Sequence, residues 1–293
     1  MKTLRTETRN GVGIITLTRA AEYNTITPEL RDELANAIDD ADADHDVHVI
    51  LLRAEGPAFC AGYALAGSTR AQAGETSRKR VWDSVADYGM ISQYVKVYMK
   101  LWYARKPTIA AVHGWCIGGG TDMVLCADLI VAAESASFGY PPSRVWGTPT
   151  TAMWVYRMGL ERAKRYLLTG DEISAPEAAR IGLILETAPD DQLDARATAL
   201  AERMAQVPTN QLEMLKLLCT PPRIWGWPHR GWSARCSTES HGTRRKASIS
   251  SRAHKPQASG KPSASATIHS ATMARGQDPK LARQKGKGKL NLM

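Results

Sequence analysis

Three consecutive glycines at residues 118–120 constrain the fold of this chain more than any other feature of its sequence. They open an apolar segment that reaches residue 128 and carries one acidic side chain near its start, Asp122. Glycines allow positive φ angles and a close approach to a ligand, and a helix that follows them begins with unpaired N–H groups. The pattern indicates either a turn that binds an anion, such as a phosphate or a reaction oxyanion, or a turn needed only for close packing.

A second glycine turn lies upstream, in the sequence Pro-Ala-Phe-Cys-Ala-Gly-Tyr-Ala-Leu of residues 57–65. It follows the apolar run 47–52, which predicts a strand that ends in a tight turn at Gly62. Each of the two turns can offer one backbone N–H group. Together they favour an oxyanion hole, in which two N–H groups face one oxygen atom.

Strand and helix signals alternate along the chain, which predicts an α/β fold. Thr27 is placed to cap a helix that has Pro28 at its first position and aliphatic residues on one face. Ser174 and Glu177 have the spacing of a capping box for a later helix. We expect buried strands at residues 13–18, 48–53, 108–112 and 129–132.

The composition predicts a globular protein with a large core. The chain has 293 residues, of which 43% are hydrophobic, enough for one large domain. No apolar run approaches the roughly 20 residues of a membrane span, so we expect no membrane association. The expected first strand follows the initiator residue so closely that there is no room for a signal peptide, and a cytoplasmic location is expected. The cysteines show no metal-ligand spacing, so no metal is expected.

Residues 221–293 differ sharply in composition from the rest of the chain. They hold 15 of the 38 Lys and Arg residues but only two of the 29 acidic ones, and they show no sustained apolar period. We expect this basic, low-complexity tail to be disordered. Because the remaining residues are mildly acidic, we expect no nucleic-acid partner. Two explanations of the tail are open: an out-of-frame product that begins near Thr220, or a genuine basic tail.

The two turns, together with the segments 106–114, 137–141 and 168–183, resemble the enoyl-CoA hydratase/isomerase (crotonase) superfamily. The resemblance runs from about residue 4 to about residue 218. It implies a crotonase-like α/β domain over residues 1–220, built from ββα repeats that form a spiral core. It further implies a homotrimer or dimer of trimers, and a substrate that is an acyl-CoA thioester. Coenzyme A would be part of that substrate, with no other cofactor.

The resemblance also assigns the site. In this family, two backbone N–H groups hold the thioester oxygen while acidic side chains move protons at the α and β carbons. The matching N–H groups here are those of Tyr63 and Gly119, and the first acidic position is Asp122, whose alternative role is to complement a helix dipole. The other residues expected at the substrate are Ala61, Gly62, Gly118, Gly120, Tyr140 and Pro142.

The chain departs from the hydratase pattern at the second acidic position, which is Pro142. Proline cannot move a proton, so a two-acid addition of water would need another proton carrier. No motif places such a group, and the candidates are Tyr63, Glu75, Asp83, Asp87, Tyr88 and Tyr140.

Three functions follow as expectations from the resemblance and from this departure. The nearest label is enoyl-CoA hydratase, an enzyme of fatty acid or related acyl-CoA metabolism. A double-bond isomerase, or another enzyme that forms an enolate with one acid, is the alternative within the family. An acyl-CoA-binding or oligomer subunit without catalysis is the alternative from another class. Acyl-CoA turnover would separate the first two from the third.

Overall fold

The computed structural model describes residues 1–64, 83–144 and 147–220. The basic tail expected at residues 221–293 and the candidate Glu75 lie outside the described residues. No helix among those described is both long enough and apolar enough to cross a membrane.

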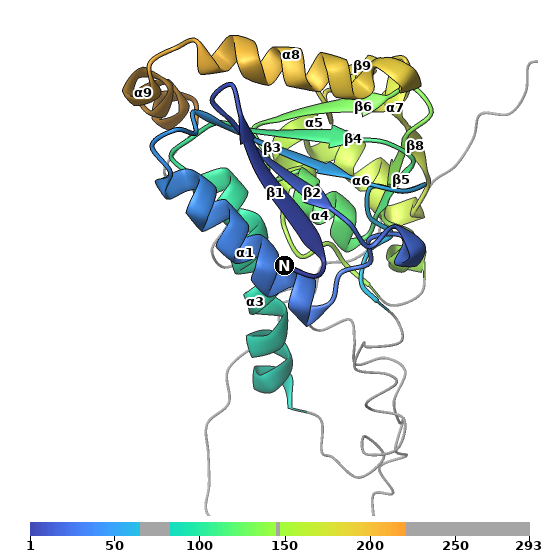
Figure 1. Cartoon of the computed structure of the whole chain (residues 1–293). Helices are drawn as coiled ribbons and strands as arrows, with labels where there is room; N and C mark the ends of the chain where they lie inside the picture. Colours follow the sequence, from blue (N-terminus) through green and yellow to red (C-terminus); the bar gives the residue numbers. More distant parts are fainter. Residues whose placement is uncertain (65–82, 145–146, 221–293) are drawn as a thin grey trace, which may run out of the picture. The chain divides into compact units, whose positions relative to one another are not determined.

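A six-stranded sheet in the order β1-β2-β3-β4-β6-β9 lies at the centre of the described chain (Figure 1). The first two strands are antiparallel and the other pairs are parallel. Both faces of β2, β3, β4 and β6 are covered, which explains their nearly continuous apolar sequences. The strands are β1 (Leu4–Arg9), β2 (Val12–Leu17), β3 (Val49–Ala54), β4 (Thr108–Val112), β6 (Leu129–Ala133) and β9 (Glu186–Ala188).

A second, three-stranded sheet has the order β5-β7-β8. It consists of β5 (Trp115–Ile117), β7 (Ser137–Gly139) and β8 (Ile173–Ser174). Along the chain, β4, β5 and the helix α4 form one ββα unit, and β6 and β7 begin the next. The helices are α1 (Pro28–Ala43), α3 (Ser84–Tyr103), α4 (Gly119–Val124), α5 (Met153–Met158), α6 (Leu160–Thr169), α7 (Ala175–Arg180), α8 (Leu193–Ala205) and α9 (Thr209–Cys219), with short 3-10 helices η1 (Ala20–Glu22), η2 (Pro141–Arg144) and η3 (Asp190–Gln192).

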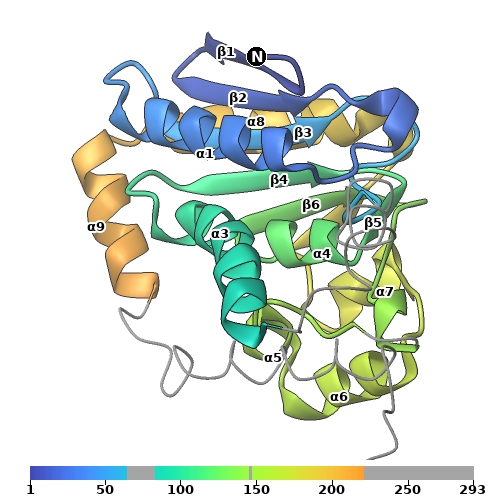
Figure 2. The ribbon, with the colours of Figure 1, turned by 90° about the horizontal axis from the view of Figure 1, so that it is seen from below.

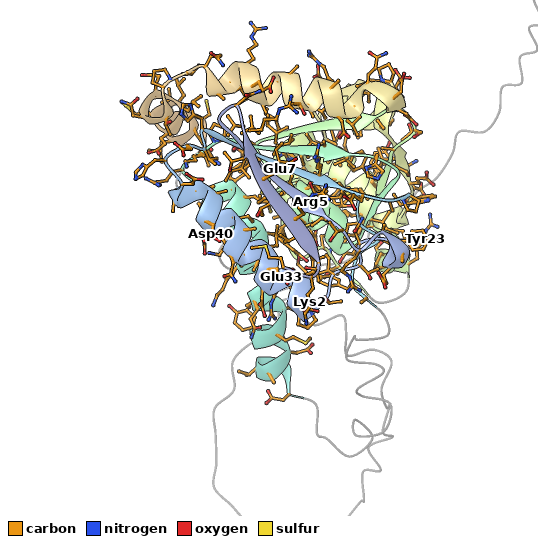
Figure 3. The ribbon with its side chains drawn as sticks, in the orientation of Figure 1. Lys2, Arg5, Glu7, Tyr23, Glu33 and Asp40 are labelled. Carbon is orange, nitrogen blue, oxygen red and sulfur yellow. The ribbon has the colours of Figure 1, made fainter. Side chains whose placement is uncertain are left out.

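Helices cover both faces of the large sheet. α8 packs on β3, β4 and β6, and α1 lies over the opposite face (Figures 1 and 2). α1 begins as the sequence predicts, because the Thr27 hydroxyl accepts a hydrogen bond from the N–H of Leu30 at 3.2 Å. The carboxylate of Glu33, in the same helix, accepts hydrogen bonds from the N–H groups of Lys2 and Thr3. The start of the chain is therefore bound to α1 (Figure 3).

The α/β class predicted from the sequence is confirmed. The four predicted strands are β2, β3, β4 and β6, each within one residue of its expected bounds. The predicted capping box is wrong in its interactions, although Ser174 does precede α7. The Ser174 side chain makes no cap hydrogen bond, and Glu177 instead forms two charge-assisted hydrogen bonds with Arg180, at 2.6 and 2.7 Å. Such bonds are roughly twice as strong as neutral ones, so the carboxylate prefers the arginine.

The last helix, α9, is fastened to the core by a buried cation. The Lys216 ammonium donates to the carbonyl oxygens of Leu101 and Lys106 at 3.1 and 3.0 Å, and it lies 2.7 Å from Oδ2 of Asp128. The same oxygen of Asp128 accepts a hydrogen bond from the N–H of Thr108, at the start of β4. One carboxylate therefore joins the beginning of β4 to the C-terminal helix.

The opposite side of α9 is apolar and exposed. Its four large hydrophobic residues there have exposed fractions between 45% and 82%. A contiguous apolar surface of this kind marks an interface or promotes aggregation. These residues are Met214, Leu215, Leu217 and Leu218.

Replacement of Lys216 by Met should therefore loosen α9. The side chain keeps its length, but Asp128 loses its cation and two buried carbonyl oxygens lose their donor. We expect the free energy of unfolding to fall by about 3 kcal/mol, the lower end of the usual cost of breaking a buried pair, because Thr108 still holds Asp128. Urea denaturation measures the change. The matched control is Lys164→Met on the exposed side of α6, and an equal loss in both variants would contradict the anchoring role.

Candidate active site

The two glycine turns lie side by side because the chain segments before them pair. Cys60 and Cys116 form a parallel bridge in which the N–H of Cys60 donates to the carbonyl oxygen of Trp115 and the N–H of Ile117 donates to that of Cys60, both at 3.1 Å. Each segment then runs two residues further into its glycine turn. The turns are therefore aligned by backbone hydrogen bonds, without any contribution from their side chains.

Glycine is required in these turns by the closeness of the two backbones. Gly62 and Gly118 have φ angles of +88° and +57°, which other residues rarely adopt. A Cβ atom on Gly62 would lie 3.1 Å from the carbonyl oxygen of Ile117, and one on Gly120 would lie 2.5 Å from that of Cys60. The same hypothetical atom on Gly62 would lie 3.6 Å from the nitrogen of Gly119, so the second turn begins directly beside the first.

The N–H groups of Tyr63 and Gly119 have no acceptor among the described residues. The two neighbours of Tyr63 in the sequence are hydrogen-bonded to Ile26. The N–H of Ile26 donates to the carbonyl oxygen of Gly62, and the N–H of Ala64 donates to the carbonyl oxygen of Ile26. In a parallel bridge of this type the N–H of the middle residue points away from the partner strand. Gly119 is the first residue of α4, whose initial N–H groups have no partner within the helix.

Asp122 lies one helical turn after Gly119 and its side chain is completely buried. Its Oδ2 atom accepts hydrogen bonds from the N–H and the hydroxyl of Thr150, at 2.7 and 2.8 Å. Its Oδ1 atom is 3.4 Å from the indole nitrogen of Trp154. Burial raises the pKa of this carboxyl to about 7, and the hydrogen bonds from Thr150 and Trp154 oppose that rise. The group can therefore exist in either protonation state near neutral pH.

The phenol ring of Tyr63 packs against the first turn of α4. A Cβ atom on Gly119 would lie 2.7 Å from Cε2 of this ring, so only glycine fits there. The hydroxyl of Tyr63 accepts a hydrogen bond from that of Tyr98, at 3.2 Å, and the Thr150 side chain is a second hydrogen-bonding neighbour. Burial raises the pKa of Tyr63 well above its usual value, and the charge of Asp122 adds to the effect. The phenol is therefore protonated at neutral pH.

The comparisons with known proteins agree with this geometry. The sequence model of the enoyl-CoA hydratase/isomerase family matches residues 7–220. The chain belongs to this family. A crystal structure of an enoyl-CoA hydratase from Mycobacterium smegmatis is 42% identical to it, with a TM-score of 0.70 over 75% of this chain and 77% of that one.

Two further relatives show how much of the family's length is shared. The crystal structure of a probable enoyl-CoA hydratase, also from M. smegmatis, has a TM-score of 0.72 at 30% identity, over 81% of this chain and 92% of that one. A probable enoyl-CoA hydratase of Rhizobium meliloti is 32% identical over 70% of this chain and 76% of its own sequence. The family's crotonase fold is therefore the fold of this chain.

The position that the family pattern gives to a second acid is occupied by a proline ring beside the glycines. Pro142 lies in η2, and its Cγ atom would be 3.8 Å from a Cβ atom on Gly118. Tyr140, two residues earlier, is buried, and its hydroxyl donates to the carbonyl oxygen of Thr148 at 2.7 Å. Ala61 lies within the first turn, where its N–H donates to the carbonyl oxygen of Tyr23. Tyr140, Pro142 and Ala61 thus lie within the two turns or next to them in the structure.

The other candidate proton carriers have different surroundings. Asp83 caps α3 by accepting hydrogen bonds from the N–H groups of Val85 and Ala86. Sequence reasoning did not find Thr150 or Tyr98, because neither belongs to a motif. Each reaches the site from a segment that folding alone brings there.

The raised pKa of Asp122 has a consequence for stability. An unfolded Asp titrates near pH 3.9, so between that value and about 7 the folded state holds one more proton at this group than the unfolded state. The stability that this group contributes is complete below about pH 4 and is lost as the pH rises toward 7. We expect the free energy of unfolding of the wild type to fall with rising pH by up to about 1.4 kcal/mol per unit more steeply than that of Asp122→Asn.

Urea denaturation between pH 4 and pH 8 measures this difference in slope. Asp40→Asn is the matched control, because Asp40 lies exposed on α1 (Figure 3). Parallel stability curves for the wild type and Asp122→Asn would show that Asp122 is ionised throughout and would contradict the effect of burial.

Proposed function

We propose that this protein acts on an acyl-CoA thioester and stabilises the enolate of that thioester. Enoyl-CoA hydratase is the nearest activity, and it is the name that the relatives carry. The observation that carries the proposal is the position of Asp122 one helical turn after Gly119, whose N–H, like that of Tyr63, has no acceptor among the residues that the structure describes. Coenzyme A is part of the substrate, and no further cofactor is needed for this chemistry.

The N–H groups of Tyr63 and Gly119 would hold the thioester oxygen. As the enolate forms, negative charge develops on that oxygen in a site shielded from water. Preorganised donors are strongest there, and loss of one such donor typically costs about 3–4 kcal/mol of barrier. Both donors belong to the backbone, and glycine at positions 62, 118 and 120 lets the two turns approach closely enough to face one atom. This is the oxyanion hole that the resemblance implies.

Asp122 would be the proton carrier. Its pKa of about 7 lets the carboxylate accept a proton and return it at neutral pH, which is the condition for efficient acid–base catalysis. Its hydrogen bonds from Thr150 fix the carboxylate in one orientation. A carboxylate in the first turn of α4 also complements the helix dipole, but this one accepts its hydrogen bonds from Thr150 rather than from the first N–H groups of the helix.

A double-bond isomerase is the second candidate, and Pro142 favours it. The ring of Pro142 occupies the space beside Gly118 without offering a proton. An isomerase can move one proton between two carbons of the acyl chain with a single carboxylate, whereas hydration needs both a base for water and an acid for the α carbon. The two reactions differ in what Asp122 deprotonates first, water or a carbon of the acyl chain, and in the need for a second acid.

Crotonyl-CoA hydration, followed by the loss of ultraviolet absorbance, tests the first candidate. A 3-enoyl-CoA substrate, followed by the appearance of the conjugated product, tests the second. Turnover of either one supports the proposal. Tight binding of acyl-CoA without turnover of either would instead identify a binding subunit, and the absence of both would reject acyl-CoA as the ligand.

We further propose a homotrimer or a dimer of trimers. The exposed apolar residues of α9 support association through a surface that includes this helix. Analytical ultracentrifugation of the full chain measures the mass. A monomer that stays soluble at high concentration would reject this assembly.

Asp122→Asn should lower turnover by about 10²-fold or more while coenzyme A binding and the fold are retained. The substitution keeps the size of the side chain but removes its charge and its ability to carry a proton. Steady-state kinetics give the change in kcat, and circular dichroism checks the fold. Asp40→Asn on α1 serves again as the control. Turnover within a factor of two of the wild type would exclude Asp122 from the mechanism.

Pro142→Glu should raise the rate of hydration relative to that of isomerisation. The new carboxyl would stand beside Gly118, where the family pattern places a second acid. The ratio of the two kcat values for crotonyl-CoA and a 3-enoyl-CoA measures the effect. Pro141→Glu, one residue away on the exposed side of η2, is the control. If the ratio stays unchanged, the combination with Asp122→Glu tests whether the aspartate is too short to share a water molecule with the new acid.

A further inference from the structure

The absence of a second acid at Pro142 raises the question of which group protonates the α carbon. The candidate groups differ in the hydrogen bonds that they make in the structure. Asp83 is engaged at the start of α3, and the hydroxyl of Tyr140 donates to the carbonyl oxygen of Thr148. The hydroxyl of Tyr63 differs from both, since its two described neighbours are themselves hydroxyl groups, those of Tyr98 and Thr150.

We infer that the Tyr63 hydroxyl is the second proton carrier of the site, linked to Asp122 through the hydroxyl of Thr150. This inference rests on the proposed acyl-CoA chemistry. Thr150 is the common neighbour: its hydroxyl donates to Oδ2 of Asp122 at 2.8 Å, and its side chain also contacts the hydroxyl of Tyr63. In this proposal the hydroxyl of Thr150 connects the phenol with the carboxyl.

The position of the Tyr63 ring would bring its hydroxyl close to the α carbon of the acyl group. The backbone N–H of Tyr63 and that of Gly119 face the thioester oxygen in the proposed function, and the ring of Tyr63 packs against the first turn of α4. The ring therefore runs from the oxyanion hole toward Thr150, along the side of α4 that also carries Asp122. The α carbon is bonded to the thioester carbon, so it lies beside this ring.

With these groups, every proton and electron pair in the addition of water is accounted for without another reactant. The Asp122 carboxylate takes a proton from water as the water oxygen bonds to the β carbon, and the electrons of the carbon–carbon double bond move to the thioester oxygen. The enolate collapses as its α carbon takes the proton of the Tyr63 hydroxyl, because a thioester enolate is a stronger base than a phenolate. Thr150 passes its proton to the phenolate and receives one from the Asp122 carboxyl. Water has been added, and all three groups are restored.

Tyr98 acts in this scheme as a positioning residue. It is buried, and its hydroxyl donates to that of Tyr63, so the Tyr63 proton is directed away from Tyr98. Burial and the neighbouring Tyr63 hold the pKa of Tyr98 well above its usual value, so its own proton stays in place. A fixed donor behind Tyr63 also stabilises the transient phenolate by a hydrogen bond.

Tyr63→Phe tests the inference, because it keeps the backbone N–H and the ring that packs on Gly119 and removes only the hydroxyl. We expect kcat for crotonyl-CoA hydration to fall by about 10²-fold, with KM and the melting temperature nearly unchanged. The acid limb of the pH–rate profile, which reports Asp122, should stay in place at the lower rate. Tyr98→Phe should lower kcat by less, and Thr150→Ser, which keeps the hydroxyl, should restore most of what Thr150→Val loses.

Tyr94→Phe is the matched control, since its ring meets that of Tyr63 edge to face at 5.3 Å between centroids and lies outside the hydroxyl path. Wild-type kcat in Tyr63→Phe would overturn the inference, and so would a joint change of kcat, KM and melting temperature, which marks a packing role. If Tyr63→Phe does not fold, the comparison of Thr150→Val with Thr150→Ser decides by the same criteria. A wild type that neither binds nor converts any acyl-CoA would reject the proposed function itself, an outcome separate from these.

Discussion

The parallel bridge between Cys60 and Cys116 is the interaction on which the site depends. Two backbone hydrogen bonds of 3.1 Å align segments that are more than fifty residues apart in the sequence, and each segment enters its glycine turn two residues later. Both cysteines are completely buried, so their side chains support the bridge from within the core. The distance between the two turns is therefore set by main-chain geometry. Side chains can change there as long as the glycines stay.

The burial of Asp122 follows from the same arrangement. A short helix that starts from Gly119 must run into the interior, and its fourth residue is then surrounded by the segment that contains Thr150 and Trp154. Desolvation raises the pKa of the carboxyl, and hydrogen bonds from Thr150, Trp154 and Thr151 oppose the rise, with the result near neutrality. Desolvation and the hydrogen bonds shift the pKa of Asp122 in opposite directions. Removal of Thr150 would raise this pKa above neutrality, and exposure to water would lower it.

The sequence predicts the parts of this structure that are encoded locally. Buried parallel strands require apolar runs, and β2, β3, β4 and β6 were found from such runs, which end at turn residues. Short strands such as β5 and β7 carry no such signal, since three residues are too few for a period. The capping box at Ser174 was predicted wrongly because the motif does not include the competing arginine one turn later, Arg180.

In the site, too, the residues that belong to local motifs were predicted and those brought in by packing were not. The glycines, Asp122 and Pro142 were found because they stand at fixed spacings within sequence motifs. In the folded chain these residues lie close to one another. Thr150 and Tyr98 come from segments 28 and 35 residues away from their partners Asp122 and Tyr63. Contacts of that range depend on how helices and loops pack, which a single sequence does not state. The hydrogen bonds of Tyr98 with Tyr63 and of Thr150 with Asp122 could therefore be read only from the structure.

The use of backbone donors explains how one family can keep its substrate class and vary its reaction. At residue 63 the main chain and the side chain have separate tasks. The N–H is fixed by the bridge with Ile26, so any residue that fits beside Gly119 supplies the same donor. The side chain at that position is then free to bring a different group to the acyl carbons. In the proposed mechanism of this chain it brings a phenol to the site, while Pro142 stands where the resemblance implies a second acid. The two positions belong to different elements, the turn after β3 and η2, so a change at either one leaves the glycine turns unaltered.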